Sequence, residues 1–259
     1  MSVNQEQVRY WNEEGADQWL TRQDRLDTML AVFLPPLLAA VAASAGDHVL
    51  DVGCGSGATT LELAGIVGPA GRVMGLDVSR PLLDRLQERA GSMGLANVLV
   101  RQAGAQVAPL PPGHFDVVAS RFGVMFFDDP VAAFANLARA TKPGGRLAFV
   151  CWQPVDRNPW FAEPLAAAMA EVADPKLPPP GSPGPFALSN PERVCEVLRA
   201  GGFEAMTVES LTVDLDSGTP DEAAAFTINS TMVRRPCARD RRVPGGGPSP
   251  HGSPHRRLP

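Results

Sequence analysis

The stretch "VLDVGCGSGATT", Val49 to Thr60, decides the fold. It starts as a short apolar strand, passes through glycines at every second position, and continues into a helix-forming segment from Thr59. A glycine turn between a strand and a helix lets the backbone approach a nucleotide closely, because glycine has no Cβ and readily adopts positive φ. The stretch therefore predicts the first strand–turn–helix unit of a nucleotide-binding α/β fold.

Strand and helix signals keep alternating after this unit. Short apolar strands separated by helices predict right-handed βαβ units, and hence an α/β fold with a doubly wound, mostly parallel sheet and helices on both faces. The predicted strands span residues 48–54, 71–78, 97–102, 115–122 and 146–152, and the predicted helices between them span residues 59–67, a segment capped by Ser79 with Pro81 in its first turn, and residues 130–141.

The segment that follows Trp152 is less regular. It predicts a helix over 160–173, a loop over 174–186, a helix over 189–202 and a further strand over 205–215. The second of these helices has a Ser189-x-x-Glu192 capping box at its start and glycines at its end.

Composition limits the classes of function. With 259 residues, of which 44% are hydrophobic, the chain can bury a substantial core. The formal net charge of −5 is unevenly divided, because residues 233–259 hold seven arginines and one acid, Asp240, for +6, which leaves −11 for the other residues. An acidic body argues against a nucleic-acid partner.

Cysteine usage and the amino-terminal segment predict a cytoplasmic protein without a membrane span. The four cysteines are scattered, which suits a reducing compartment and predicts no disulfide or metal framework. The polar start shows no signal peptide. The stretch Thr28 to Gly46 lacks charge, but Pro35 and Pro36 in its middle would break a spanning helix, so we expect two buried helical pieces.

Asp51 separates two possible ligands of the glycine turn. The turn satisfies a loose dinucleotide fingerprint, Gly53-x-Gly55-x-x-Ala58, and Asp77 ends the second strand where a ribose-binding acid is expected. A carboxylate at this place would repel the pyrophosphate of a dinucleotide. It would attract S-adenosylmethionine, which carries a positive α-ammonium and a positive sulfonium and no phosphate. The turn therefore favours S-adenosylmethionine.

Four motifs stand at the starts or the ends of the predicted strands. They are Asp51-x-Gly53-x-Gly55-x-Gly57, Asp77 at the end of the second strand, Phe115-Asp116-Val117-Val118 at the start of the fourth, and Lys142-Pro143-Gly144-Gly145 before the fifth. Together they resemble the class I S-adenosylmethionine-dependent methyltransferases, and in particular the methyltransferase-11 type, which includes quinone-biosynthesis C-methyltransferases. The resemblance extends from about Val8 to Asp214 and implies a Rossmann-like sheet.

The resemblance also implies which residues bind the cofactor, S-adenosylmethionine. The methionine end would be held by Asp51 and the turn residues Gly53, Cys54, Gly55 and Gly57; the ribose hydroxyls by Asp77; the adenine by Val78, Ala105 and Gln106; and the methyl-bearing region by Ser120 and Arg121. One position departs from the family, which has an Asp-Ala pair after the third strand where this chain has Gly104-Ala105. The missing acceptor would weaken adenine binding by about 1–2 kcal/mol.

The residues identify neither a catalytic base nor a metal site. His48 and His114 fall at the amino edge of the predicted sheet, away from the ligand, and His251 and His255 fall near the end of the chain. The remaining candidate bases are Glu13, Glu14, Asp128, Asp129 and Tyr10. Methyl transfer from a sulfonium is an in-line displacement that alignment and exclusion of water can promote. The catalytic residue therefore stays unknown.

Aromatic residues predict a cover over the site. Tyr10, Trp11 and Trp19 lie in the amino-terminal helical segment, and Trp152 and Trp160 flank the loop after the fifth strand. Such a cover fits an apolar or aromatic acceptor, such as a quinone or a polyketide.

The sequence thus predicts an enzyme that transfers a methyl group from S-adenosylmethionine to a small organic acceptor. The alternatives are an NAD(P)-dependent oxidoreductase of Rossmann type, which Asp51 disfavours, and a catalytically defective cofactor-binding product, which Gly104 and the end of the chain keep open.

Residues 1–232 are predicted to form the methyltransferase domain. It comprises a helical cover over 1–46, a cofactor-binding core over 47–152, and substrate-side helices with a last strand over 153–232. Residues 233–259 read as a basic, disordered tail rich in proline, glycine and arginine. With 21 arginines and 2 lysines, the chain is typical of GC-rich coding DNA, and we hypothesise that it leaves its ancestral reading frame near Thr227 to Val233. The fifth strand would then lack its antiparallel neighbour.

Overall fold

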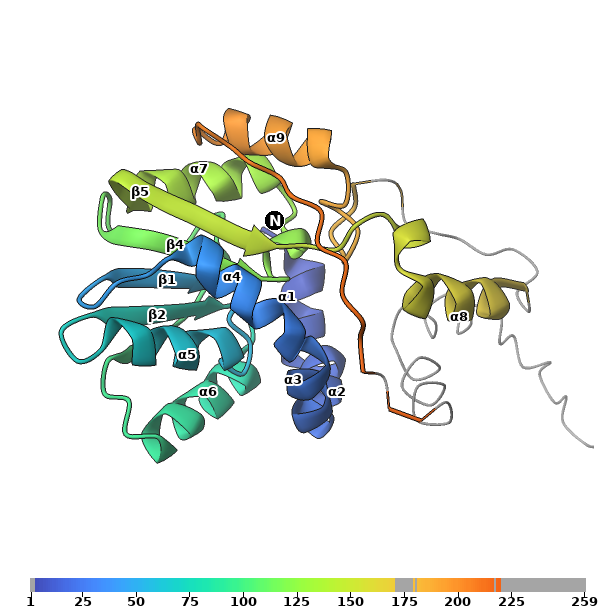
Figure 1. Cartoon of the computed structure of the whole chain (residues 1–259), viewed down its shortest axis with the longest axis horizontal. Helices are drawn as coiled ribbons and strands as arrows, with labels where there is room; N and C mark the ends of the chain where they lie inside the picture. The colour runs from blue at the N-terminus through green and yellow to red at the C-terminus, as the bar shows by residue number, and fades with distance from the viewer. Residues whose placement is uncertain (1–2, 171–178, 180, 217, 220–259) are drawn as a thin grey trace, which may run out of the picture.

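A computed structural model describes residues 3–170, 179, 181–216 and 218–219 of the chain. Its centre is a parallel sheet with the strand order β3-β2-β1-β4-β5, which confirms the predicted fold class (Figure 1). The strands are β1 (His48–Val52), β2 (Arg72–Asp77), β3 (Val98–Gln102), β4 (Phe115–Arg121) and β5 (Thr141–Val150). The order reverses at β1, and ligands of such sheets bind beyond the carboxyl ends of the strands at that point.

Helices cover both faces of the sheet (Figure 1). The helices α4, α5 and α6 pack on one face, and α7 with α9 packs on the other. The helices of the described residues are α1 (Gln5–Asn12), α2 (Glu14–Thr21), α3 (Gln23–Leu30), η1 (Ala31–Phe33), α4 (Leu34–Val41), α5 (Ala58–Val67), α6 (Arg80–Ser92), η2 (Val124–Phe126), α7 (Pro130–Ala140), η3 (Val155–Arg157), α8 (Pro159–Ala170) and α9 (Pro191–Ala200).

The core is divided by the sheet into two halves. Successive residues of a strand point to opposite faces, so an apolar run that is buried on both sides fills both halves. In β1, Leu50 packs in the cluster that contains Phe134 of α7, whereas Val49 packs in the cluster that contains Leu63 of α5. Asp51 therefore points to the same face as Val49, toward α5.

The uncharged amino-terminal stretch forms separate helical pieces, as predicted. Helix α3 ends at Leu30, the short η1 follows, and α4 begins at Leu34 with Pro35 and Pro36 in its first turn. Proline is tolerated there because the first N–H groups of a helix have no intrahelical acceptor. Among the described residues, no helix is long and apolar enough to cross a membrane.

Helix caps confirm one prediction and correct another. Ser79 caps α6, and its side chain accepts a hydrogen bond from the Leu82 N–H at 3.4 Å. The capping box predicted from Ser189 is wrong, because Asn190 is the residue that caps α9 and accepts from the Arg193 N–H at 2.7 Å. An asparagine is as good a cap as a serine, and it stands directly before the proline that opens the helix.

The strand predicted over residues 205–215 is not formed. The described residues of this segment have no strand pairing, and β5 pairs only with β4 within the described part of the chain. Val208 and Leu211 are 44% and 38% exposed, whereas both ends of the segment contact the core, through Met206 at one end and Val213 with Leu215 at the other. Alternation of apolar and polar residues alone therefore does not make this segment a strand.

Strand β5 also begins earlier than predicted. It starts at Thr141 and contains Lys142 to Gly145, where its pairing with β4 is shifted between Phe115 and Val117. Gly144 has a φ of 76°, which suits a local bulge. The sequence motif therefore forms an irregularity within the strand rather than a turn before it.

Several predictions fall outside the described residues. These are residues 171–173 of the predicted helix, residues 174–178 and 180 of the predicted loop, the part of the predicted domain over 220–232, the proposed frame departure and the basic tail.

Candidate functional site

The turn after β1 is built from glycines because neighbouring backbone approaches it. Gly53 has a φ of 66°, and a Cβ there would lie 2.5 Å from the Cα of Gly123 in the loop after β4. Gly57 has a φ of 92°, and a Cβ there would lie 2.2 Å from the Leu86 side chain of α6. Only glycine fits both positions, so the turn is held between β4 and α6.

Asp51 is a buried carboxylate with one oxygen unused. Asp51 is 1% exposed, and its Oδ2 accepts a hydrogen bond from the Thr60 hydroxyl of α5 at 2.6 Å. The second oxygen, Oδ1, is buried and has no hydrogen-bond partner within the described residues. Burial raises the pKa of Asp51 to about 6, against the opposing effects of the Thr60 hydrogen bond and the charge of Arg121. A free carboxylate oxygen in this setting is a site for a cation.

Asp77 joins the glycine turn to the start of α6. Its Oδ2 accepts from the Gly55 N–H at 2.9 Å, and its Oδ1 accepts from the Ser79 N–H at 2.8 Å. Burial raises the pKa of Asp77, while these backbone hydrogen bonds oppose the rise. Each carboxylate oxygen has a second lone pair, so the group can still accept from a diol.

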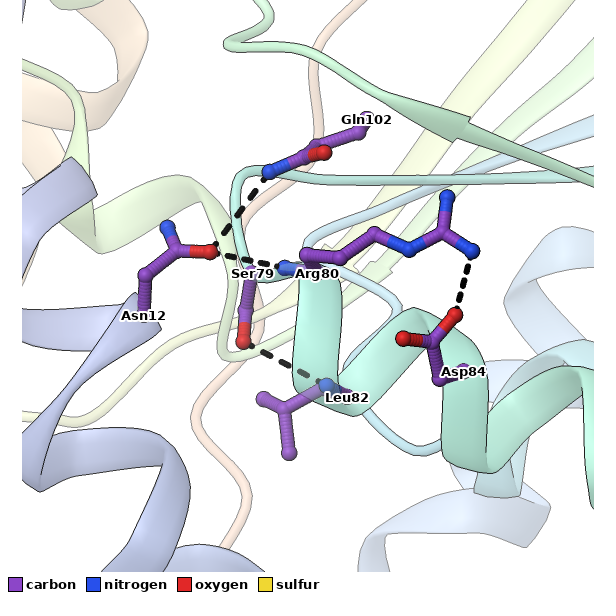
Figure 2. Close-up of polar contacts among 6 residues, drawn as sticks. All are labelled: Asn12, Ser79, Arg80, Leu82, Asp84 and Gln102. Carbon is purple, nitrogen blue, oxygen red and sulfur yellow. Dashed lines mark hydrogen bonds and ion pairs between the residues drawn. The ribbon is translucent and has the colours of Figure 1, made fainter.

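The turn after β2 is also held from outside the sheet. The carbonyl oxygen of Val78 accepts from the Asn12 side chain of α1 at 2.9 Å and from the Gln102 side chain at 3.1 Å. Asn12 in turn accepts from the Arg80 N–H, the first of α6, at 2.9 Å (Figure 2). Helix α1 thus reaches the position where the sequence places the adenine.

Charged side chains from α3, β4 and α6 lie next to the glycine turn. Arg121, at the end of β4, donates to the Leu30 carbonyl of α3 at 3.0 Å. Burial lowers the pKa of Arg121, against the favourable charges of Asp27 and Asp51. Arg89 of α6 pairs with Asp27 at 3.1 Å and donates to the Ser56 carbonyl of the turn at 2.8 Å. The arginine side chains therefore link α3 to the turn and set a positive group near Asp51.

Two other predicted site residues have structural hydrogen bonds. The buried Ser120 hydroxyl donates to the Val52 carbonyl at 2.7 Å and accepts from the Gly123 N–H at 3.1 Å, so it ties β4 to β1. The Gln106 side chain accepts from the Asp128 N–H at 3.2 Å and so holds the loop after β4.

Cys54 and Ala105 are packing residues in the structure. Cys54 lies in a cluster with Leu83 and Leu86, and burial keeps the pKa of its thiol well above the ordinary value. Ala105 is buried, and its carbonyl accepts from the Asn136 side chain at 2.7 Å.

Gly104 has room for a side chain. Its φ is not in the left-handed region, and a Cβ would meet only Val78 Cγ1, at 3.8 Å. The backbone therefore accepts the aspartate that the family carries at this position.

Aromatic residues gather around the loop after β4. Trp11 packs edge-on against Phe126 with ring centroids 5.4 Å apart, and Trp19 packs against Trp11 at 6.1 Å. On the other side, Trp152 stacks on Phe122 at 4.3 Å. This arrangement places both predicted covering segments at the carboxyl end of β4.

The second aromatic group continues into α8. Trp160 lies 5.2 Å from Trp152. The indole nitrogens of Trp160 and Trp19 are buried without a hydrogen-bond partner among the described residues.

The histidines of the sheet lie at its opposite edge. His48 begins β1 and His114 precedes β4, and their rings lie 4.9 Å apart. No group of three potential metal ligands occurs in the part of the chain that the structure describes.

Sequence reasoning missed four contacts of this site. They come from Asn12, Thr60, Arg89 and Gln102. Only Thr60 had a usable signal, because the first turn of a helix after a glycine turn faces the end of the preceding strand. The backbone groups that the other three contact lie 24 to 68 residues away in the sequence.

Comparisons with known proteins show which family this fold belongs to. A family model described as a methyltransferase domain matches residues 49–145. Nocamycin O-methyltransferase from Saccharothrix syringae is 32% identical over 187 residues, which are 69% of this chain and 66% of that protein. A ubiquinone/menaquinone biosynthesis C-methyltransferase from Ectopseudomonas mendocina (strain ymp) is 40% identical over 103 residues, 39% of this chain and 40% of that protein.

A solved structure shows the same fold. The SAM-dependent methyltransferase from Aquifex aeolicus is 25% identical, with a TM-score of 0.51 over 69% of this chain and 81% of that chain. The fold and the family model thus define a Rossmann-like methyltransferase domain. The chain belongs to the class I S-adenosylmethionine-dependent methyltransferases, and it spans 40% to 66% of the two curated relatives named above. The comparisons give no support to an oxidoreductase.

Proposed function

We propose that this protein transfers a methyl group from S-adenosylmethionine to a small organic acceptor. The observation that carries the proposal is the buried Asp51 carboxylate at the glycine turn, whose Oδ1 has no hydrogen-bond partner among the residues that the structure describes. A phosphate at this turn would meet a negative charge, whereas an α-ammonium would supply the missing hydrogen-bond donors. The residues present therefore fit the amino-acid end of this methyl donor.

The other binding residues take complementary roles in the proposal. Arg121, which donates to the Leu30 carbonyl, supplies a positive charge for the carboxylate of the same amino-acid end. Asp77 accepts from the ribose hydroxyls with the lone pairs that Gly55 and Ser79 leave free. The donor supplies an electrophilic methyl group on a sulfonium.

The chain promotes the reaction by alignment and by excluding water. Two aromatic groups stand at the carboxyl end of β4, one with Trp11 and one with Trp152. The histidines lie at the other edge of the sheet, so no histidine of the described residues is placed to remove a proton. Fixing two reactants in line replaces much of the entropic cost of their encounter.

The acceptor proposed for this site is an apolar or aromatic molecule that carries oxygen atoms. The aromatic groups offer stacking surfaces. The indole N–H groups of Trp19 and Trp160 have no acceptor among the described residues, so they offer two donors to an acceptor carbonyl or hydroxyl after a small side-chain movement. Relatives named for O-methylation and for quinone C-methylation agree with this class of acceptor.

We also infer a cytoplasmic location, supported by free thiols at Cys54, Cys151 and Cys195. The acidic body supports a small-molecule partner rather than a nucleic acid.

Thermal unfolding with three ligands tests the proposed function. A ligand at 100 times its dissociation constant stabilises the folded state by about 2.7 kcal/mol. At about 2–4 °C per kcal/mol for a domain of this size, S-adenosylmethionine and S-adenosylhomocysteine should each raise the Tm by roughly 5–11 °C. NAD⁺ should leave the Tm unchanged. Stabilisation by NAD⁺ alone would overturn the proposal in favour of the oxidoreductase, and stabilisation by none would favour a defective product.

A further inference from the structure

Helix α1 is fastened at its carboxyl end by one asparagine. The Asn12 side chain donates to the Val78 carbonyl at 2.9 Å and accepts from the Arg80 N–H at 2.9 Å, with Gln102 at 3.5 Å beside it. Figure 2 shows Asn12 reaching from α1 to the start of α6, where Ser79 caps the next N–H groups. Asn12 therefore completes the cap of α6 from another part of the chain.

The amino end of α1 is fastened by a second asparagine. The Asn4 side chain donates to the Phe126 carbonyl at 2.9 Å, in the segment after β4. Trp11 packs against the ring of the same Phe126. Helix α1 is thus attached to the loop after β2 at one end and to the loop after β4 at the other.

The two attachment points lie on either side of the glycine turn. Strands β2 and β4 are the neighbours of β1 in the sheet, so their separation is two strand spacings, about 9.6 Å. The distance along a helix from Asn4 to Asn12 is about 12 Å. Helix α1 therefore has the length to cross the carboxyl end of β1, above Asp51 and the turn.

Helix α1 has no buried residue, in contrast to α3, where Leu26, Met29 and Leu30 are buried. Its apolar packing comes from half-buried rings, such as Trp11 against Trp19 and Phe126. An element with few buried apolar contacts opens at a small fraction of the global unfolding free energy. The contacts of the two asparagines therefore have a large share in keeping α1 closed.

We propose that α1 is a strap over the nucleotide site, fastened by Asn4 and Asn12, and that it must release for the cofactor to enter or leave. The inference rests on the proposed function for the identity of the ligand. Asn12 is a positioning residue, because it acts through Val78 and Arg80 on the turn that presents Asp77. The strap opens, the ligand exchanges at the glycine turn, and the asparagines close again on backbone groups that are present in both states.

Stopped-flow tryptophan fluorescence with S-adenosylhomocysteine tests the strap in the full chain. In Asn12→Ala and in Asn4→Ala, we expect the dissociation rate constant to rise about tenfold, the equivalent of about 1.4 kcal/mol. The association rate constant should rise as well, because the free protein is open for more of the time. A residue that only contacts the closed complex would change dissociation alone.

Matched variants on the same helix provide the controls. Glu6→Ala removes an exposed side chain of α1 and should leave both rate constants within about twofold of wild type. Asn12→Asp keeps the acceptor for the Arg80 N–H at the start of α6 but loses the donor to Val78, so its rate constants should lie between those of wild type and Asn12→Ala.

The outcomes separate the strap from the proposed function. The strap would be overturned if the association rate constants of Asn12→Ala and Asn4→Ala were no higher than that of Glu6→Ala. If Asn12→Ala does not fold, Asn4→Ala and Asn12→Asp provide the same comparison. If wild type does not bind S-adenosylhomocysteine, the proposed function fails and hydrogen exchange of the free protein decides the strap. Faster exchange over residues 5–12 in Asn12→Ala than in Glu6→Ala supports it, and equal exchange overturns it.

Discussion

At the scale of single residues, the two carboxylates of the site differ in the hydrogen bonds that they accept. In the described part of the chain, Asp51 has one oxygen that accepts a hydrogen bond and one without a partner, whereas both oxygens of Asp77 accept backbone hydrogen bonds. The first arrangement leaves a buried charge uncompensated, which a cation would correct. The second holds a carboxylate in one orientation, where it can meet a diol. The two acids are thus prepared for different parts of one ligand.

The positions of both acids could be predicted, because each stands at the end of an apolar run that reads as a strand. Their hydrogen bonds could not. The partner of Asn12 at Val78 is 66 residues away, and nothing near Asn12 in the sequence marks it as a cap for a distant helix. Ser120 is a similar case. Its position near the end of β4 could be predicted, but the hydrogen bond from its hydroxyl to the Val52 carbonyl of β1 could not.

Asp77→Ala should weaken S-adenosylmethionine binding about tenfold or more, a loss of about 1.4 kcal/mol, because the ribose loses a bidentate acceptor. Isothermal titration of the folded variant measures this. Glu62→Ala, which removes an exposed acid from α5, is the control and should bind like wild type. Unchanged affinity in Asp77→Ala would show that the ribose is held elsewhere.

Gly104→Asp should tighten cofactor binding and increase the preference for adenine over other bases. The substitution is unstrained, because a Cβ at Gly104 would meet only Val78, at 3.8 Å. One added hydrogen bond to the adenine amino group is worth about 1 kcal/mol, or roughly fivefold in affinity. Titration with S-adenosylhomocysteine and its inosine analogue measures both effects. Equal affinities of variant and wild type would place the adenine away from residue 104.

At the scale of elements, the strands and helices of the sheet were predictable because each has an apolar period of its own and a clear stop. Residues 205–215 have a similar alternation and yet form no strand among the described residues. A strand needs a partner edge as well as a pattern, and the sequence does not show whether the edge of β5 is taken. The cap of α9 was misplaced by one residue because Ser189 and Asn190 are adjacent and equally suitable.

The packing of the glycine turn between elements gives a further prediction. Gly53→Ala should lower the Tm and abolish cofactor binding, because its Cβ would lie 2.5 Å from the backbone of Gly123 and its φ is 66°. Gly65→Ala, in the exposed middle of α5 with no atom within 4 Å of its Cβ, should raise stability by about 1 kcal/mol. Calorimetry of both variants measures the contrast. A Gly53→Ala protein as stable as wild type would contradict the close approach of the two loops.

At the scale of the whole molecule, the charge is divided between two parts of the chain. The acidic part carries the site, whereas the arginines of residues 233–259 lie beyond the predicted methyltransferase domain, which ends at residue 232. Deleting residues 233–259 should therefore leave S-adenosylhomocysteine affinity unchanged within about twofold. A large loss of affinity would make these residues part of the domain.

The reading-frame hypothesis is tested on the coding DNA. A shift of one base after Thr227 to Val233 should reveal an amphipathic helix and an apolar strand, which would supply a neighbour for β5. If neither alternative frame does so, the basic segment is better explained as an arm for an anionic partner.

The protonation of Asp51 affects stability and binding in opposite ways. Its pKa in the folded protein is about 6, above the ordinary value of 3.8, so the folded state binds more protons than the unfolded state between these limits. The contribution of Asp51 to the stability of the free protein therefore falls as the pH rises through this window. Binding of an ammonium group gains over the same range, because only the ionised carboxylate attracts it.

The most direct test of the account is therefore the affinity for S-adenosylhomocysteine at pH 5 and pH 7, measured by isothermal titration. With a pKa of about 6 for Asp51, we expect wild type to bind about tenfold more tightly at pH 7 than at pH 5. Asp51→Asn should lose this pH dependence and bind about tenfold more weakly than wild type at pH 7. Two results would contradict the proposal that the Asp51 carboxylate binds the ammonium of the methyl donor. One is a wild-type affinity that falls from pH 5 to pH 7, and the other is an affinity that does not change in Asp51→Asn.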